Sequence, residues 1–118
     1  MCLDKLKDFK VKQSVGYKVF SKDSNGILHS RFQKSHYLLY INKWITAEQT
    51  TRYTDMLESY LTGFHIFLRK ADAIRWHGYN PNISIIKKVK FKNIIAKGVE
   101  RDMEIVVVNK MLILPNQR

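Results

Sequence analysis

The stretch ISIIKKVKFKN, residues 83–93, decides the fold of this chain. Side chains alternate between the two faces of a β-strand. In such a strand Lys88, Lys90 and Lys92 share one face, and the other face carries the apolar residues Ile83, Ile85, Val89 and Phe91. This alternation predicts a strand with one buried face and one basic face.

Further strands are predicted on both sides of this stretch, since β-branched and aromatic residues recur in short runs. The residue pair Asn25-Gly26 predicts a tight turn, because both residues tolerate positive φ angles. The last run is one long strand, or two strands broken near Asn109, and Pro115 ends it. In chain order the predicted strands cover residues 15–20, 27–32, 37–45, 63–68 and 104–114.

Residues 69–77 predict a short helix that ends at the breaker cluster of residues 78–82. Ala71 and Ile74 are expected to face inward, with Trp76 or His77 as a further inward side chain. Residues 46–62 fit two alternatives, a helix capped by Thr46 or a loop. Residues 1–13 fit a flexible lead-in or one amphipathic turn.

The element order predicts an α+β fold, a mostly antiparallel sheet of about five to six strands with one or two short helices on one face. The chain has 118 residues, of which 45% are hydrophobic. That length suits one domain with a hydrophobic core of its own, so residues 1–118 are expected to form a single domain.

The charge balance indicates the kind of partner. There are 21 Lys and Arg residues against 10 Asp and Glu residues, which gives a net charge of +11 and an isoelectric point near 9.9. Such an excess attracts polyanions, so we expect nucleic acid, RNA ahead of DNA, or a nucleoprotein as the partner.

The three alternating lysines are the first candidate binding residues, because their side chains would project at intervals of about 6.6 to 7 Å. This spacing is close to the phosphate repeat of an extended nucleic-acid strand. Two other interpretations stay open: a solvated sheet face, or an edge strand protected by lysines against aggregation.

Other candidate binding residues lie near the basic strand in the sequence. Trp76 and Tyr79 flank His77-Gly78 and could stack on exposed bases, although such aromatic residues are also common in cores. None of the known nucleic-acid-binding motifs is present. The nearby cationic candidates are Arg69, Lys70, Arg75 and Lys87.

Catalytic patterns are weak, so we expect a protein without enzymatic activity, cofactor or metal. No two of the four histidines have the i, i+4 spacing of a helical metal pair, and the glycines form no phosphate-binding loop. One alternative is kept: a small nucleotide-handling enzyme, similar to an ADP-ribosyltransferase, that uses Tyr17 and His65 from separate strands. The competing interpretation of His65 is a hydrogen-bonded structural histidine.

Cellular location follows from what the sequence lacks. Cys2 is the single cysteine, which excludes an internal disulfide and suits a reducing compartment. No apolar run approaches the roughly 18 residues of a membrane span, and the first residues do not form a signal peptide. We therefore expect a protein of the host-cell cytoplasm that does not bind membranes.

Short motifs in order along most of the chain look like those of a group of small uncharacterised phage and prophage proteins. The motifs are Met1-Cys2-Leu3, Gly16-Tyr17-Lys18-Val19-Phe20, Tyr40-x-x-x-Trp44, Gly63-Phe64-His65-x-Phe67, Asp72-Ala73, Lys88-Val89-Lys90, Ile95-Ala96-x-Gly98 and Lys110-Met111-x-Ile113-Leu114. The resemblance implies a biological setting and no catalytic residues. Small charged phage proteins often occupy host machinery, so the resemblance implies an anti-defence inhibitor, similar in character to anti-CRISPR proteins, that binds a host nucleoprotein such as a CRISPR effector.

Overall fold

The computed structural model describes residues 3–22, 28–29, 41–77 and 84–115. Within these ranges the chain forms nine strands and one helix. The strands are β1 Lys5–Leu6, β2 Val15–Lys22, β3 Leu28–His29, β4 Trp44–Thr46, β5 Thr51–Tyr53, β6 Ser59–Leu61, β7 Phe64–Phe67, β8 Ser84–Glu100 and β9 Met103–Ile113, and the helix is α1 Lys70–His77. The pairings of these strands are antiparallel, which confirms the predicted α+β class, but the strands outnumber the five or six expected.

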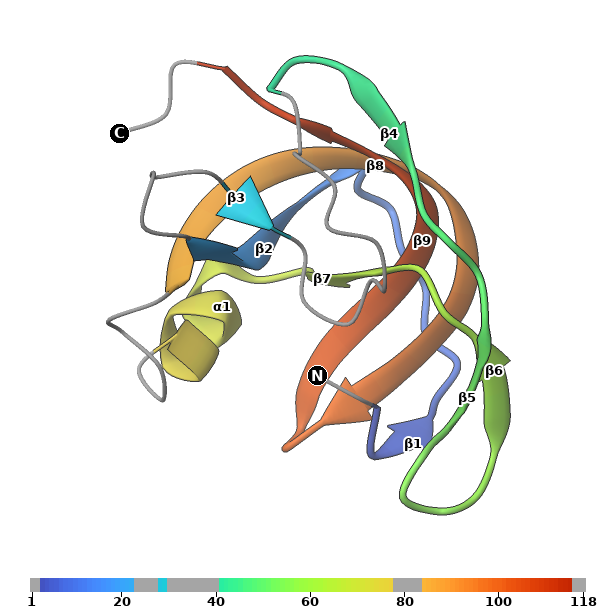
Figure 1. The fold of residues 1–118 in the computed structure, drawn as a ribbon. Helices are drawn as coiled ribbons and strands as arrows, with labels where there is room; N and C mark the ends of the chain where they lie inside the picture. Colours follow the sequence, from blue (N-terminus) through green and yellow to red (C-terminus); the bar gives the residue numbers. More distant parts are fainter. Residues whose placement is uncertain (1–2, 23–27, 30–40, 78–83, 116–118) are drawn as a thin grey trace.

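Four of the strands close into a ring. Residues 84–90 of β8 pair with β2, and residues 89–100 pair with β9. The other edge of β9 pairs with β7, and β7 meets β2 at the pair formed by Tyr17 and Phe67. Figure 1 shows β8 and β9 arching around β2 and β7. The result is a small barrel-like sheet, to which β1, β3 and β4 add at the edges.

A bend in β8 allows one strand to serve both neighbours. Asn93 has a φ of 60°, in the left-handed region, and the register between β8 and β9 shifts between Ile94 and Ala96. Extra residues of this kind bend and twist a strand. The strand predicted over residues 83–93 therefore continues past Asn93 to Glu100.

Two hydrophobic clusters stabilise the fold. The first draws on all four ring strands and fills the space that they enclose, with Phe20, Phe64, Phe91 and Met111 among its buried side chains. The second lies on the opposite face of β7 and β9, under α1, Leu3 and Tyr60. Alternate residues of β7 and of the first half of β9 enter the two clusters, which explains why both strands are rich in apolar residues.

Helix α1 confirms the helix predicted over residues 69–77, and its predicted inward face is right at Trp76 but wrong at Ala71 and Ile74. Ala73 and Trp76 are buried, whereas Ala71 and Ile74 are exposed. The Trp76 ring lies 6.4 Å from the Phe67 ring and sets how the helix docks. The helix packs against β2, β7 and β8 (Figure 1).

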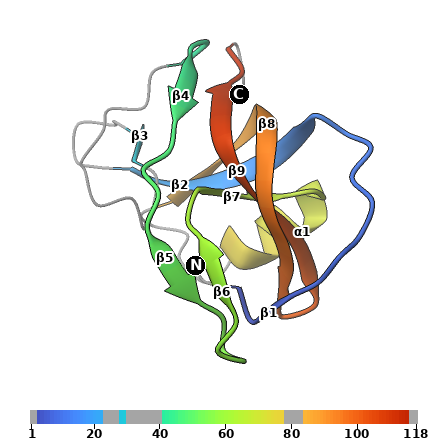
Figure 2. The same ribbon diagram turned by 90° about the vertical axis from the view of Figure 1, so that its right-hand side faces the viewer.

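Residues 46–62 are neither the helix nor the loop that the sequence suggested. They begin at the last residue of β4 and contain β5 and β6, which pair in a hairpin that stands to one side of the ring in Figures 1 and 2. The threonines at positions 50, 51 and 54 favour strands over helix, and Thr62 Oγ1 accepts a hydrogen bond from the Thr50 amide at 2.8 Å.

The N-terminal residues are more ordered than a lead-in or a single helical turn. Leu3 is fully buried, and β1 pairs with residues 98–99 of β8. The Asp4 carboxylate accepts a 2.7 Å hydrogen bond from the Arg101 amide, which ties this segment to the turn between β8 and β9.

Strands at 15–20, 63–68 and 104–114 are confirmed as β2, β7 and β9, and β9 is unbroken. The strand at 27–32 is confirmed in part by β3. Asn25-Gly26 and residues 37–40 lie outside the described residues. Of the strand predicted over residues 37–45, the described part is confirmed at Trp44 and Ile45 of β4. No helix among the described ranges is long and apolar enough to cross a membrane.

Candidate nucleic-acid interface

The basic strand has the two faces that its sequence predicted. Lys88, Lys90 and Lys92 are exposed, while Val89 and Phe91 between them are buried in the ring. Val89 and Phe91 anchor β8 by packing inside the ring, so the three lysine side chains project from the outer surface of the sheet.

Strand register adds a fourth lysine to this surface. Lys92 lies directly opposite Lys110 of β9, and side chains of directly opposed residues share a face. We call the surface formed by Lys88, Lys90, Lys92 and Lys110 the lysine face. Like charges placed directly opposite each other are destabilising, so the lysine face carries electrostatic repulsion within the folded chain.

The lysine face does not protect a sheet edge. Lys90 pairs with Val15 of β2 on one side and with Leu112 of β9 on the other. Because this part of β8 lies inside the sheet, its backbone groups are already paired and need no protection from a further strand. The interpretation of the lysines as edge protection is therefore wrong at Lys90, where a solvated face or a binding face remains.

Trp44 joins the same surface from β4. It pairs with Leu112, the residue opposite Lys90, and 44% of its surface is exposed. The Lys92 Nζ lies 4.1 Å from the centroid of the Trp44 ring, which is a close cation–π contact. The lysine face thus has an exposed indole at its border.

No acidic residue falls on the strand segments that build this surface. These segments are residues 15–17, 44–46, 84–92 and 110–112, and none contains Asp or Glu. These segments therefore bring no carboxylate to the lysine face.

Lys87 is separated from the other lysines of β8. It is half-buried and lies opposite Lys18 of β2, on the face that points away from Lys88. The strand alternation accounts for this position, since adjacent residues point to opposite faces.

The cations predicted near the helix belong to a different element. Arg69 and Lys70 are exposed at the start of α1, and Arg75 is exposed near its end. The Arg75 guanidinium donates to the Arg101 carbonyl at 3.4 Å. These three side chains do not form part of the strand rows that make up the lysine face.

The two predicted stacking residues have different outcomes. Trp76 is only 8% exposed and packs on Phe67, so its ring is part of the core and does not serve as a platform for bases. Tyr79 lies outside the described residues. Trp44 and Lys110 were not among the sequence candidates, because only strand register brings them beside Lys90 and Lys92.

The alternative enzyme site is enclosed at His65. The His65 Nε2 lies 3.3 Å from the Tyr60 hydroxyl, and Tyr60 also accepts a hydrogen bond from the Leu3 amide. Burial, and then the charge of Lys18, lower the pKa of His65 to about 3, so its ring is neutral near pH 7. Tyr17 pairs with Phe67, whereas the His65 ring contacts the Tyr60 hydroxyl.

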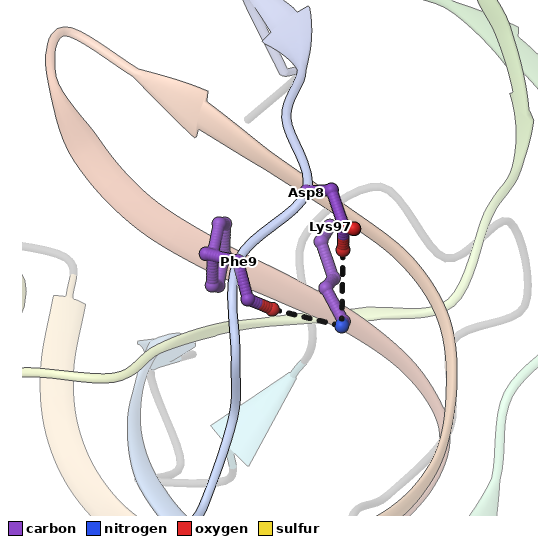
Figure 3. Close-up of polar contacts among 3 residues, drawn as sticks. All are labelled: Asp8, Phe9 and Lys97. Atoms are coloured by element: carbon purple, nitrogen blue, oxygen red, sulfur yellow. Dashed lines mark hydrogen bonds and ion pairs between the residues drawn. The ribbon is translucent and has the colours of Figure 1, made fainter.

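An open groove of about 410 Å³ lies between the N-terminal segment, β6 and the second half of β8. At its border the Lys97 ammonium donates to the Phe9 carbonyl at 2.9 Å and lies 3.4 Å from the exposed Asp8 carboxylate (Figure 3). Lys97 therefore links the N-terminal segment to β8, and its ammonium group interacts with Asp8 and Phe9 of the same chain.

Comparisons of the chain with protein-family models, with curated proteins and with solved structures give no match.

Proposed function

We propose that this protein works by binding RNA through the lysine face, without catalysing a reaction. The observation that supports the proposal is the direct opposition of Lys92 and Lys110 on a surface that already carries Lys88 and Lys90. Repulsion among these ammonium groups is relieved when phosphates lie between them. Binding of a polyanion therefore stabilises the folded chain, because it offsets the electrostatic repulsion among these lysines.

RNA fits this surface better than a single anion does. The lysines are spread along β8 and across to β9, so a chain of phosphates can contact several of them at once. Each neutralised phosphate releases condensed counterions, which makes such binding strong at low salt.

The RNA can be free or held in a nucleoprotein. The form that we propose is an inhibitor that competes for RNA, or for the surface around it, in a host assembly such as an RNA-guided defence nuclease. The resemblance to phage proteins and the net charge of +11 support this form.

The first test is the salt dependence of binding. A fluorescent single-stranded RNA of ten nucleotides is titrated with the protein from 50 to 300 mM salt, and anisotropy reports the affinity. If four lysines each neutralise one phosphate, log Kd should change with log salt with a slope of about 2.8, from 0.7 per phosphate. Absence of RNA affinity at 50 mM salt would overturn the proposal.

A pair of matched variants locates the binding surface. Lys88→Glu, Lys90→Glu and Lys92→Glu combined should weaken RNA binding by on the order of a hundredfold. The control variant combines three substitutions at α1, Arg69→Glu, Lys70→Glu and Arg75→Glu. It changes the net charge by the same amount and should weaken RNA binding much less. Equal losses in both variants would mean that total charge, and not the lysine face, determines binding.

A further inference from the structure

Trp44 is an exposed aromatic residue beside the lysine face, and the binding of phosphates alone does not require it. The indole is 44% exposed, on a three-residue strand that joins the barrel through β9. Large aromatic side chains usually bury most of their surface. The exposure of Trp44 next to four lysines therefore suggests a role in contacting a ligand.

The Lys92 ammonium defines what kind of ligand fits. It lies 4.1 Å from the centre of the indole, so a flat group on the Trp44 ring also lies beside a cation. A nucleobase has both properties required, because its face stacks on aromatic rings and its backbone carries a phosphate. An acidic peptide would satisfy the lysines but would leave the indole without a flat partner.

The strand geometry sets the distance between the Trp44 ring and the lysines of β8. Trp44, Leu112 and Lys90 lie in one row across β4, β9 and β8. Neighbouring strands are about 4.8 Å apart, so Trp44 and Lys90 are about 10 Å apart at the backbone. Long lysine side chains can span this gap to the phosphates next to a stacked base.

We infer that Trp44 and Lys92 form a stacking site for one unpaired base, and that the lysine face therefore selects single-stranded over double-stranded nucleic acid. The inference rests on the proposed function, because the lysines supply the phosphate contacts. Bases inside a duplex are stacked on their neighbours and cannot reach Trp44, so a duplex can use only the charges.

The test compares Trp44→Leu with the wild-type protein on a uridine decamer and on an RNA duplex of ten base pairs. Trp44→Leu should weaken binding of the decamer roughly tenfold or more, the range measured for one stacked base, and should leave duplex binding unchanged. The slope against salt should also stay unchanged, because no phosphate contact is lost. Trp44→Phe should retain part of the affinity.

Tyr53→Leu is the matched control, since Tyr53 is an exposed aromatic residue on the β5–β6 hairpin, away from the lysine face. It should bind both RNAs as the wild type does. The near-ultraviolet circular dichroism of the buried Trp76 verifies the fold of each variant.

The outcomes separate the inference from the proposed function. If Trp44→Leu binds the decamer as tightly as wild type while the lysine variant loses binding, the stacking site is wrong and the proposed function stands. If wild type binds duplex and decamer equally, single-strand selection is wrong. If neither RNA is bound, both are wrong, and an acidic protein becomes the partner to examine.

Discussion

Lys18 is the residue whose position is least expected for its type, because its amine is buried inside the ring. Strands β2 and β7 separate after the pair formed by Tyr17 and Phe67. The Lys18 ammonium donates to the His65 carbonyl of β7 at 3.1 Å. It lies 5.8 and 5.9 Å from the ring centres of Phe20 and Phe64. Its side chain thus links β2 to β7 beyond the pair formed by Tyr17 and Phe67.

Burial has a measurable electrostatic effect on Lys18. It lowers the pKa of the Lys18 amine to about 7, from an ordinary value near 10.5. Between these two values the unfolded chain holds the proton and the folded chain does not. The free energy of unfolding should therefore rise as pH increases from 7 to 10.5, by about 1.4 kcal/mol per pH unit within that window.

Lys18→Met should remove this rise, since methionine fills similar space and carries no proton. Urea unfolding at pH 7.5 and 9.5 measures the difference. The control is the pH dependence of stability below pH 6.5. Because the pKa of His65 is lowered to about 3, the free energy of unfolding should decrease in both proteins as the pH is lowered from 6.5 to 3. A wild-type stability that is flat between pH 7.5 and 9.5 would contradict the account of Lys18.

The β5–β6 hairpin is an element that carries local backbone strain. Its turn is well hydrogen-bonded, with the Thr54 amide donating to the Glu58 carbonyl at 2.8 Å and the Leu57 amide to the Thr54 carbonyl at 2.9 Å. Leu57 nevertheless has a φ of 61° and is 82% exposed. The left-handed region is unfavourable for leucine, and the side chain gains little burial in return.

Leu57→Gly should therefore stabilise the protein by about 0.5–1 kcal/mol, because glycine adopts positive φ without steric cost. Thermal or urea unfolding measures the change. Met56→Gly is the matched control, since Met56 is also exposed but does not have a positive φ, and it should be destabilising. Destabilisation of similar size by both changes would show that the turn conformation is not strained.

At the scale of the whole molecule, the barrel depends on the meeting of β2 and β7. Gly16 lies beside this contact, and an added Cβ would come within 2.5 Å of Ile66 Cγ2 and 2.7 Å of the Phe67 carbonyl oxygen. The backbone oxygen cannot move without moving β7. A side chain at position 16 would therefore push β2 away and open the ring.

Gly16→Ala should destabilise the protein by about 1–3 kcal/mol, the range for overpacking a tight site. Urea unfolding measures the loss, and hydrogen exchange should show faster exchange of amides in β7 than in the wild type. Ser14→Ala, at an exposed neighbouring position, should change stability by less than about 0.5 kcal/mol. Unchanged stability in Gly16→Ala would mean that the β2–β7 contact does not hold the barrel closed.

Local patterns were sufficient to predict several elements of this fold. Alternation predicted β2, β7, β8 and β9 and the exposure of Lys88, Lys90 and Lys92, because alternation depends only on consecutive residues. The breakers after residue 77 predicted where the helix ends. Strongly apolar β7 and β9 were also recognisable, although their burial on both faces was not.

The tertiary structure alone decided which residues meet across strands. Whether Trp44 and Lys110 join the lysine face depends on register between strands far apart in the sequence, and no local pattern encodes that register. The burial of Lys18 is likewise decided by the tertiary structure. Alternation places Lys18 and Val19 on opposite faces of β2, but only the closed ring determines which face is enclosed. The sequence thus determined the basic strand, and the folded sheet decided that this strand lies inside the sheet with an indole and a fourth lysine beside it.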